Sequence, residues 1–128
     1  MHRTAIITLD VSALFITLGG FYDVFTPRLP ANLLERCGEN RDAQVLVRAL
    51  LRALGGCLVA IGIAVAILAN GPVRGGQRWS FGLVLLLVLP SEGLNALGMW
   101  RVKSPYFVPI GFGILTVAGV IMAAAGSP

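Results

Sequence analysis

Five strongly polar side chains lie inside long apolar stretches of the sequence: Asp10, Arg48, Arg52, Glu92 and Asn95. Charged groups at membrane depth are costly unless they are paired or hydrated, and they often mark sites that bind or pass ions and small molecules. An arginine and a carboxylate can also form a structural pair, because the planar guanidinium suits bidentate contact with a carboxylate. These five residues are therefore the candidate binding site of the chain.

The composition predicts the elements that position them, because 56% of the 128 residues are hydrophobic and only 12% are charged. Soluble domains carry about 25% charged residues. The apolar residues gather in four blocks, each near the ~20 residues that cross ~30 Å of hydrocarbon as a helix. We predict an all-α fold, an integral membrane four-helix bundle that forms a single domain over residues 1–128, with spans at about 4–22, 45–69, 79–100 and 107–125.

The connecting segments define two sides of this bundle. Side A holds both termini and residues 70–78, and side B holds residues 23–44 and 101–106. Side B carries five Arg or Lys residues in these segments and side A carries three, which favours a cytoplasmic side B and an N-out/C-out orientation. The run between Pro30 and Gly38 predicts a short helix that is a surface connector, an interfacial helix or a lid over the bundle.

Four of the polar residues are predicted to share one layer near side B. At 1.5 Å per residue, Arg52 lies about 10 Å and Glu92 about 12 Å in from that side. Arg48 and Arg52 are four residues apart and Glu92 and Asn95 are three apart, so each pair shares a helix face. We therefore predict a polar layer between the second and third spans, in which Arg52 pairs with Glu92 and Asn95 lies beside them.

Asp10 stands apart from this layer, about 9 Å in from side A and in the other half of the membrane. Near Glu92, the sequence also predicts extra space. Pro90 removes a backbone donor, leaves the carbonyl of Leu86 unpaired and can kink the third span. Gly93 leaves room directly beside the carboxylate.

Small residues recur on one face of the second span, at Ala49, Ala53, Gly56, Ala60 and Ala64. Helices in lipid associate through small residues that let their backbones approach, so this stripe predicts a contact face. We expect the partners of the chain to be the lipid bilayer and either a second copy in a homo-oligomer or another membrane subunit.

Three functions fit these features. The first is binding or translocation of a small molecule or ion at the layer of Arg52, Glu92 and Asn95. The second is an accessory or assembly subunit of a larger membrane complex. The third is an intramembrane lipid-modifying enzyme with Glu92 as acid or base. A bidentate arginine would argue against this function, because it would keep Glu92 ionised. A structural ion pair that only fixes helix register also fits.

No catalytic residue, metal site or cofactor is predicted. One histidine, His2, and two separated cysteines, Cys37 and Cys57, do not supply a tetrahedral ligand set. The sequence contains no serine–histidine–acid set, no phosphate loop and no GxGxxG. The formal net charge of +4 is spread over the loops, so we expect no nucleic-acid surface.

The run "LFITLGGFYDVFTPRLP", followed by "LVRALLRALGGCLVAIGIAVAIL", resembles small bacterial four-span proteins of the loose DoxX-like grouping. The resemblance covers roughly residues 12–68 and lies in length, span count and a glycine-rich second helix after an interfacial arginine. It implies a four-helix protein of the bacterial inner membrane. It implies no catalytic residue, since the grouping has no shared chemical motif that maps onto this sequence.

Overall fold

A computed structural model describes residues 2–126, which form α1 (His2–Phe25), α2 (Ala31–Cys37), α3 (Arg41–Leu68), the π-helical turn η1 (Ala69–Val73), α4 (Arg78–Arg101) and α5 (Phe107–Gly126). Four stretches are long and apolar enough to cross a membrane: Arg3–Phe25, Arg41–Val73, Arg78–Arg101 and Phe107–Gly126. The predicted all-α bundle is therefore confirmed. By the length and composition of these helices, the chain is a multi-pass membrane protein.

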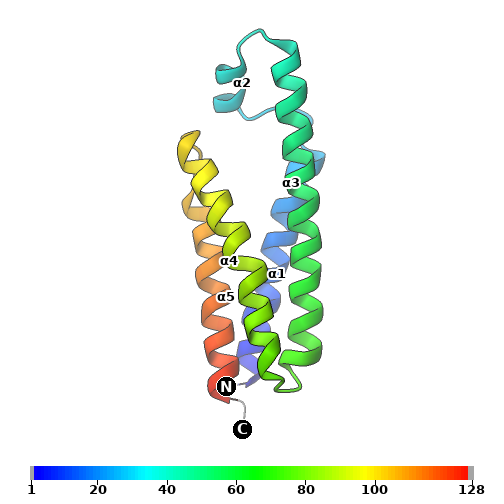
Figure 1. Cartoon of the computed structure of the whole chain (residues 1–128), viewed down its shortest axis with the longest axis vertical. Helices are drawn as coiled ribbons and strands as arrows, with labels where there is room; N and C mark the ends of the chain where they lie inside the picture. The colour runs from blue at the N-terminus through cyan, green and yellow to red at the C-terminus, as the bar shows by residue number, and fades with distance from the viewer. Residues whose placement is uncertain (1, 127–128) are drawn as a thin grey trace.

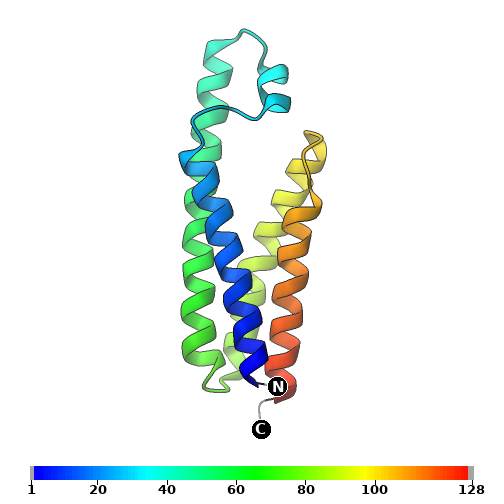
Figure 2. The same ribbon diagram turned by 180° about the vertical axis from the view of Figure 1, so that it is seen from behind.

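The four long helices alternate in direction, so the start of α1 and the end of α5 lie together at side A (Figure 1). α1 packs along both α3 and α5, and α4 packs mainly along α5. α3 and α4 lie close near the turn that joins them and diverge towards side B (Figures 1 and 2). The bundle therefore consists of two helix pairs, α1–α3 and α4–α5, which contact each other through α1 and α5.

α1 and α3 approach closely because glycines line their interface. A Cβ added at Gly55 would lie 2.6 Å from the backbone oxygen of Gly20 and 2.9 Å from the Cβ of Asp23. A Cβ added at Gly62 would lie 2.8 Å from the backbone oxygen of Ala13. Lipid provides little hydrophobic force between helices, so this backbone contact is what holds the pair together.

The small-residue stripe predicted as a contact face of α3 is on the outside of the bundle and does not pack against the other helices of the chain. Ala49, Ala53, Gly56 and Ala60 are exposed. The buried residues of α3 are instead Gly55, Leu58, Gly62 and Val65. Small residues occur on two sides of this helix, and α1 packs on the side whose glycines leave room for its backbone.

Side B is built partly from the surplus length of α3. The stretch Arg41–Val73 has 33 residues, which is about 50 Å of helix against the ~30 Å of a hydrocarbon core. The helix starts early because the side chain of Asn40 accepts a hydrogen bond from the backbone N–H of Ala43 at 3.0 Å. The surplus projects beyond the other spanning helices at side B (Figure 1).

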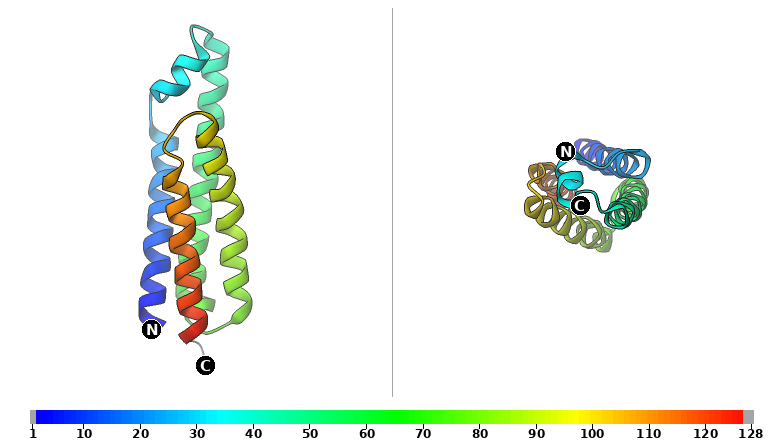
Figure 3. Two further views of the ribbon diagram at one scale, coloured as in Figure 1. Left: turned by 90° about the vertical axis from the view of Figure 1, so that its left-hand side faces the viewer. Right: turned by 90° about the horizontal axis from the view of Figure 1, so that it is seen from above.

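The short helix predicted between Pro30 and Gly38 is confirmed as α2, which lies across the end of the bundle between the two helix pairs (Figure 3). Asn32 Nδ2 donates to the backbone carbonyl of Val102 at 3.0 Å. Arg36 donates to the carbonyl of Arg101 at 3.3 Å. α2 follows α1 in the chain and bonds to the end of α4, so it connects the two helix pairs at side B.

A buried polar contact holds α1 against α5. Ser12 Oγ lies 2.7 Å from Thr116 Oγ1, and both side chains are fully buried. Both hydroxyls also lie within hydrogen-bonding distance of the carbonyl of Phe112, Thr116 Oγ1 at 2.9 Å and Ser12 Oγ at 3.3 Å, so either hydroxyl can donate to the other. The rings of Phe15 and Phe112 stack nearby, with centroids 5.8 Å apart.

We expect Ser12→Ala to lower the free energy of unfolding by about 0.6 kcal/mol, the average for a hydrogen bond between membrane helices, and by at most about 1.7 kcal/mol. Denaturant titration in mixed micelles, followed by circular dichroism, measures this change. Thr8→Ala is the matched control on α1, because its hydroxyl bonds only to the Thr4 carbonyl of its own helix. Equal effects of the two substitutions would show that the bond between helices contributes nothing.

Candidate functional site

Glu92 belongs to the interior face of α4. The buried residues of this helix recur every four positions at Val84, Val88, Glu92 and Ala96, so the carboxylate takes a place where the pattern calls for an apolar side chain. Glu92 is only 3% exposed. Its Oε2 atom is buried and has no hydrogen-bond partner among the residues that the structure describes. Buried polar atoms nearly always have partners, so this oxygen is an exception that requires an explanation.

Glu92 lines a groove of about 450 Å³ between α4 and α5. Gly93 and Gly113 leave space in the two helices, and exposed residues such as Ile114 and Ile121 border it, so the groove opens on the outer surface of the bundle. That surface faces lipid in a spanning protein. Glu92 is the one charged or hydrogen-bonding side chain among the described residues that line the groove.

The structure does not bring Arg52 to Glu92, and the predicted polar layer between the second and third spans is not formed. Arg52 is exposed on α3, whereas Glu92 is buried on α4. The two helices diverge towards side B (Figures 1 and 2). Glu92 instead shares a groove with α5, the fourth span, a pairing that was not predicted from the sequence.

The register of the helices shows how far apart the two residues are. Three contacts between neighbouring helices define it: Leu89 with Gly113, Ser12 with Thr116, and Thr17 with Gly62. Following the helix rise from these contacts, Glu92 is level with about Ile61 of α3, so Arg52 lies roughly 13 Å nearer side B. The predicted pair was wrong because depth was counted from Val45, whereas α3 begins at Arg41 and projects beyond the bundle.

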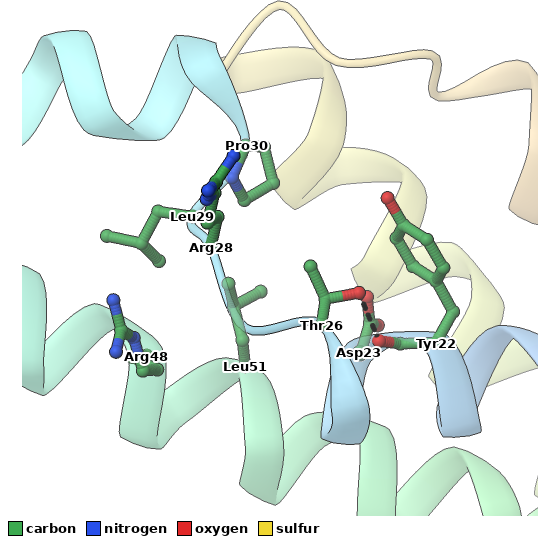
Figure 4. A pocket seen from close by; sticks show the side chains of 8 residues that line it. All are labelled: Tyr22, Asp23, Thr26, Arg28, Leu29, Pro30, Arg48 and Leu51. Atoms are coloured by element: carbon green, nitrogen blue, oxygen red, sulfur yellow. Dashed lines mark hydrogen bonds between the residues drawn. The ribbon is translucent and has the colours of Figure 1, made fainter.

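Arg48 lies one turn further towards side B and lines a different, much smaller pocket of about 20 Å³. Figure 4 shows Arg28 and Arg48 at one end of this pocket and Tyr22 and Asp23 towards the other. A space of 10–15 Å³ holds about one water molecule. This pocket is therefore large enough for water and too small for an organic ligand.

Asp10 has a partner at side A. Its Oδ1 accepts a hydrogen bond of 2.7 Å from Asn70 Nδ2, and Asn70 also donates to the carbonyl of Ala66 at 3.1 Å. Asn70 is placed by η1, where the N–H of Arg74 reaches the carbonyl of Ala69 five residues back. Asn70 lies at the start of the segment 70–78 that was predicted to connect the second and third spans, and the structure places it within η1 instead.

Asn95 is half-buried, three residues from Glu92 towards side B, and does not line the groove. Glu92 and Asn95 thus stay neighbours on α4, as Arg48 and Arg52 do on α3, and the two pairs do not meet. α4 remains helical on both sides of Pro90. The residues that form the groove are Gly93, Pro109 and Gly113, of which Gly93 was predicted from the sequence to leave room beside the carboxylate.

No family model matches the chain, and no curated protein or solved structure matches it significantly. The side chains that the structure describes contain no group of three or more His, Cys, Asp or Glu that could hold a metal ion. The class of protein is therefore defined by the fold and the groove alone. It is a four-span membrane protein that has a buried acid, without a partner among the described residues, in a groove on its lipid-facing surface.

Proposed function

We propose that this protein binds a small membrane-soluble molecule in the groove between α4 and α5, with Glu92 as its polar contact. The observation that supports this is Glu92, which lines an apolar space of about 450 Å³ and whose buried Oε2 has no partner among the described residues. Ligand sites are typically apolar concavities of about 300–1,000 Å³ with a few fixed polar groups. The groove meets that description.

A structural role for Glu92 explains less. A structural ion pair needs a cation in contact, and Arg52 is roughly 13 Å away along the bundle axis. An acid buried without a partner lowers stability, and natural proteins depart from the rules of stable packing mainly at functional sites. Glu92 is therefore better explained by a ligand than by packing.

Binding is also favoured over catalysis. An enzyme that used Glu92 as acid or base would need further groups to orient or polarise the substrate. Glycine, proline, alanine, valine, leucine and isoleucine form the rest of the groove lining, and Asn95 lies outside it. An apolar helix of a partner subunit is the remaining competitor for the groove, and the experiment below separates it from a small ligand.

We further propose that the protein resides in a bacterial inner membrane with side B in the cytoplasm. The resemblance of residues 12–68 to DoxX-like proteins supports the location. The surplus of α3 at side B supports the orientation, because it adds Arg48 and Arg52 to the five basic residues already counted there. Basic residues near the ends of spanning helices favour the cytoplasmic side.

Ligand binding is tested with three tritiated probes that share a 12-carbon chain: dodecan-1-ol, dodecanoate and dodecyltrimethylammonium. The protein is reconstituted in phosphatidylcholine nanodiscs, and binding to empty nanodiscs is subtracted. Gly93→Leu fills the groove and should weaken binding of at least one probe by about tenfold or more, equivalent to roughly two buried CH₂ groups.

Gly82→Leu is the matched control, on the same helix and outside the groove. An added Cβ meets nothing within 4 Å at Gly82 or at Gly93, so both variants should fold. Equal binding of every probe to the wild type, Gly93→Leu and Gly82→Leu would refute the proposed function. Native mass analysis of gently extracted protein gives the second test, since a stoichiometric protein partner lost in Gly93→Leu would replace the small ligand as occupant.

A further inference from the structure

The shape of the groove indicates a ligand with one chain. Its wall on α5 runs from Pro109 to Ile121, a rise of about 18 Å. α4 contributes only Leu89, Glu92 and Gly93 to the wall. Leu89 contacts Gly113, so Glu92, one turn further along α4, lies towards the side-B end of the groove. A polar group at one end and apolar walls along the remainder match a molecule with one polar head and one apolar chain. The head would lie towards side B and the chain would run towards side A.

The charges around Glu92 indicate the kind of head. α5 has no titratable side chain between Phe107 and Gly126. On α4 the nearest charged residue is Arg101, nine positions away and about 13 Å along the helix. No cation of these two helices is close enough to neutralise the carboxylate.

The other helices do not supply one either. On α1 the nearest titratable residues are Asp10, Tyr22 and Asp23, of which Asp10 bonds to η1, Tyr22 is exposed and Asp23 packs against Gly55 of α3. On α3 the adjoining stretch has only Cys57, which is exposed. Glu92 is therefore the one titratable group of its surroundings, and a positive charge must come from outside the chain.

We infer that the ligand is a single-chain organic cation of the alkylammonium type, and that its binding displaces a proton from Glu92. This inference rests on the proposed function. An ionised carboxylate in apolar surroundings is stable only beside an opposite charge, so the empty groove holds the neutral acid. When the cation binds, the carboxyl O–H bond breaks, the proton passes to water and the carboxylate stays beside the ammonium. The groove thus exchanges one positive charge for another.

The test uses dodecyltrimethylammonium, whose charge does not change with pH, so any pH dependence belongs to the protein. In phosphatidylcholine nanodiscs we expect its affinity for the wild type to rise about tenfold per pH unit until Glu92 is ionised in the empty groove, and then to level off. At pH values where Glu92 is neutral in the empty groove, about one proton should be released into unbuffered solution for each cation bound. Dodecan-1-ol should bind without releasing a proton.

Glu92→Gln removes the titrating group and keeps its shape, so proton release and pH dependence should both disappear, and affinity for the cation should fall about 10- to 100-fold. Gly82→Leu should behave as the wild type. Equal affinity for the cation and the alcohol at every pH would overturn the inference while leaving the proposed function in place. Proton release that persists in Glu92→Gln would also overturn it. Failure of all three probes to distinguish the wild type from Gly93→Leu would instead refute the proposed function.

Discussion

Gly55→Val should strongly destabilise the bundle, whereas Gly56→Val, one residue further along the same helix, should leave it nearly unchanged. A Cβ at Gly55 would lie 2.6 Å from the backbone oxygen of Gly20, so α1 and α3 must separate to admit any side chain. At Gly56 an added Cβ meets nothing within 4 Å. We expect a loss of about 3 kcal/mol for Gly55→Val, at the upper end for overpacked cores, and within about 0.5 kcal/mol for Gly56→Val.

The two variants differ only in the face of α3 that receives the new side chain, so the change in helix propensity cancels between them. Unfolding by denaturing detergent, followed by circular dichroism, gives both free energies. A Gly56→Val variant as unstable as Gly55→Val would mean that the exposed small-residue face of α3 is the packed one. Gly20→Val offers an independent check, because its Cβ would meet the backbone oxygen of Gly55 from the opposite helix.

Glu92→Leu, in contrast to Gly55→Val, should raise the free energy of unfolding, and it should also abolish ligand binding. The carboxyl is buried and Oε2 has no partner among the described residues, so nothing in the fold offsets the cost of placing it there. A buried polar group without a hydrogen-bond partner costs about 1–3 kcal/mol, and a gain of about 2 kcal/mol is expected when leucine replaces it. Glu92→Gln, which keeps a polar group, should gain less.

Unfolding titrations of the wild type, Glu92→Leu and Glu92→Gln measure the change in stability, and the nanodisc assay measures binding to the same three proteins. Together they test whether Glu92 lowers stability and supports binding. Loss of stability in Glu92→Leu would show that the carboxylate supports the fold and would remove the main argument for a ligand. A gain in stability with binding of all three probes unchanged would also contradict the proposed function, since Glu92 would then contact nothing.

The spanning helices were predictable because hydropathy alone separates them, and α2 was predictable because Pro30 and Gly38 mark its ends. The pairing of helices was not. Matching Arg52 to Glu92 by depth and charge assumed that the second and third spans face each other near side B. The glycines at Gly55 and Gly62 decide otherwise, because they allow α1 to pack along α3 and leave α4 to pack along α5.

The groove itself was hidden in the sequence for a different reason. Its space arises from atoms that are missing at Gly93 and Gly113, and such positions become a cavity only when two helices meet in the right register. The Ser12–Thr116 bond was missed for a related reason. Serine and threonine in spanning helices often bond to their own backbone, as Thr17 does to the carbonyl of Ala13, so a bond between helices is not visible in the sequence.

The position of α2 affects how the whole molecule can move. The two helix pairs contact each other along α1 and α5, where Ser12 and Thr116 bond well away from side B, and α2 connects them again at their far end through Asn32 and Arg36. Each pair therefore acts as a lever arm, whose displacement on rotation grows with distance from the Ser12 contact. The two α2 hydrogen bonds lie where that displacement is largest. The two α2 hydrogen bonds therefore resist spreading of the helix pairs at the end of the bundle that is farthest from the Ser12 contact.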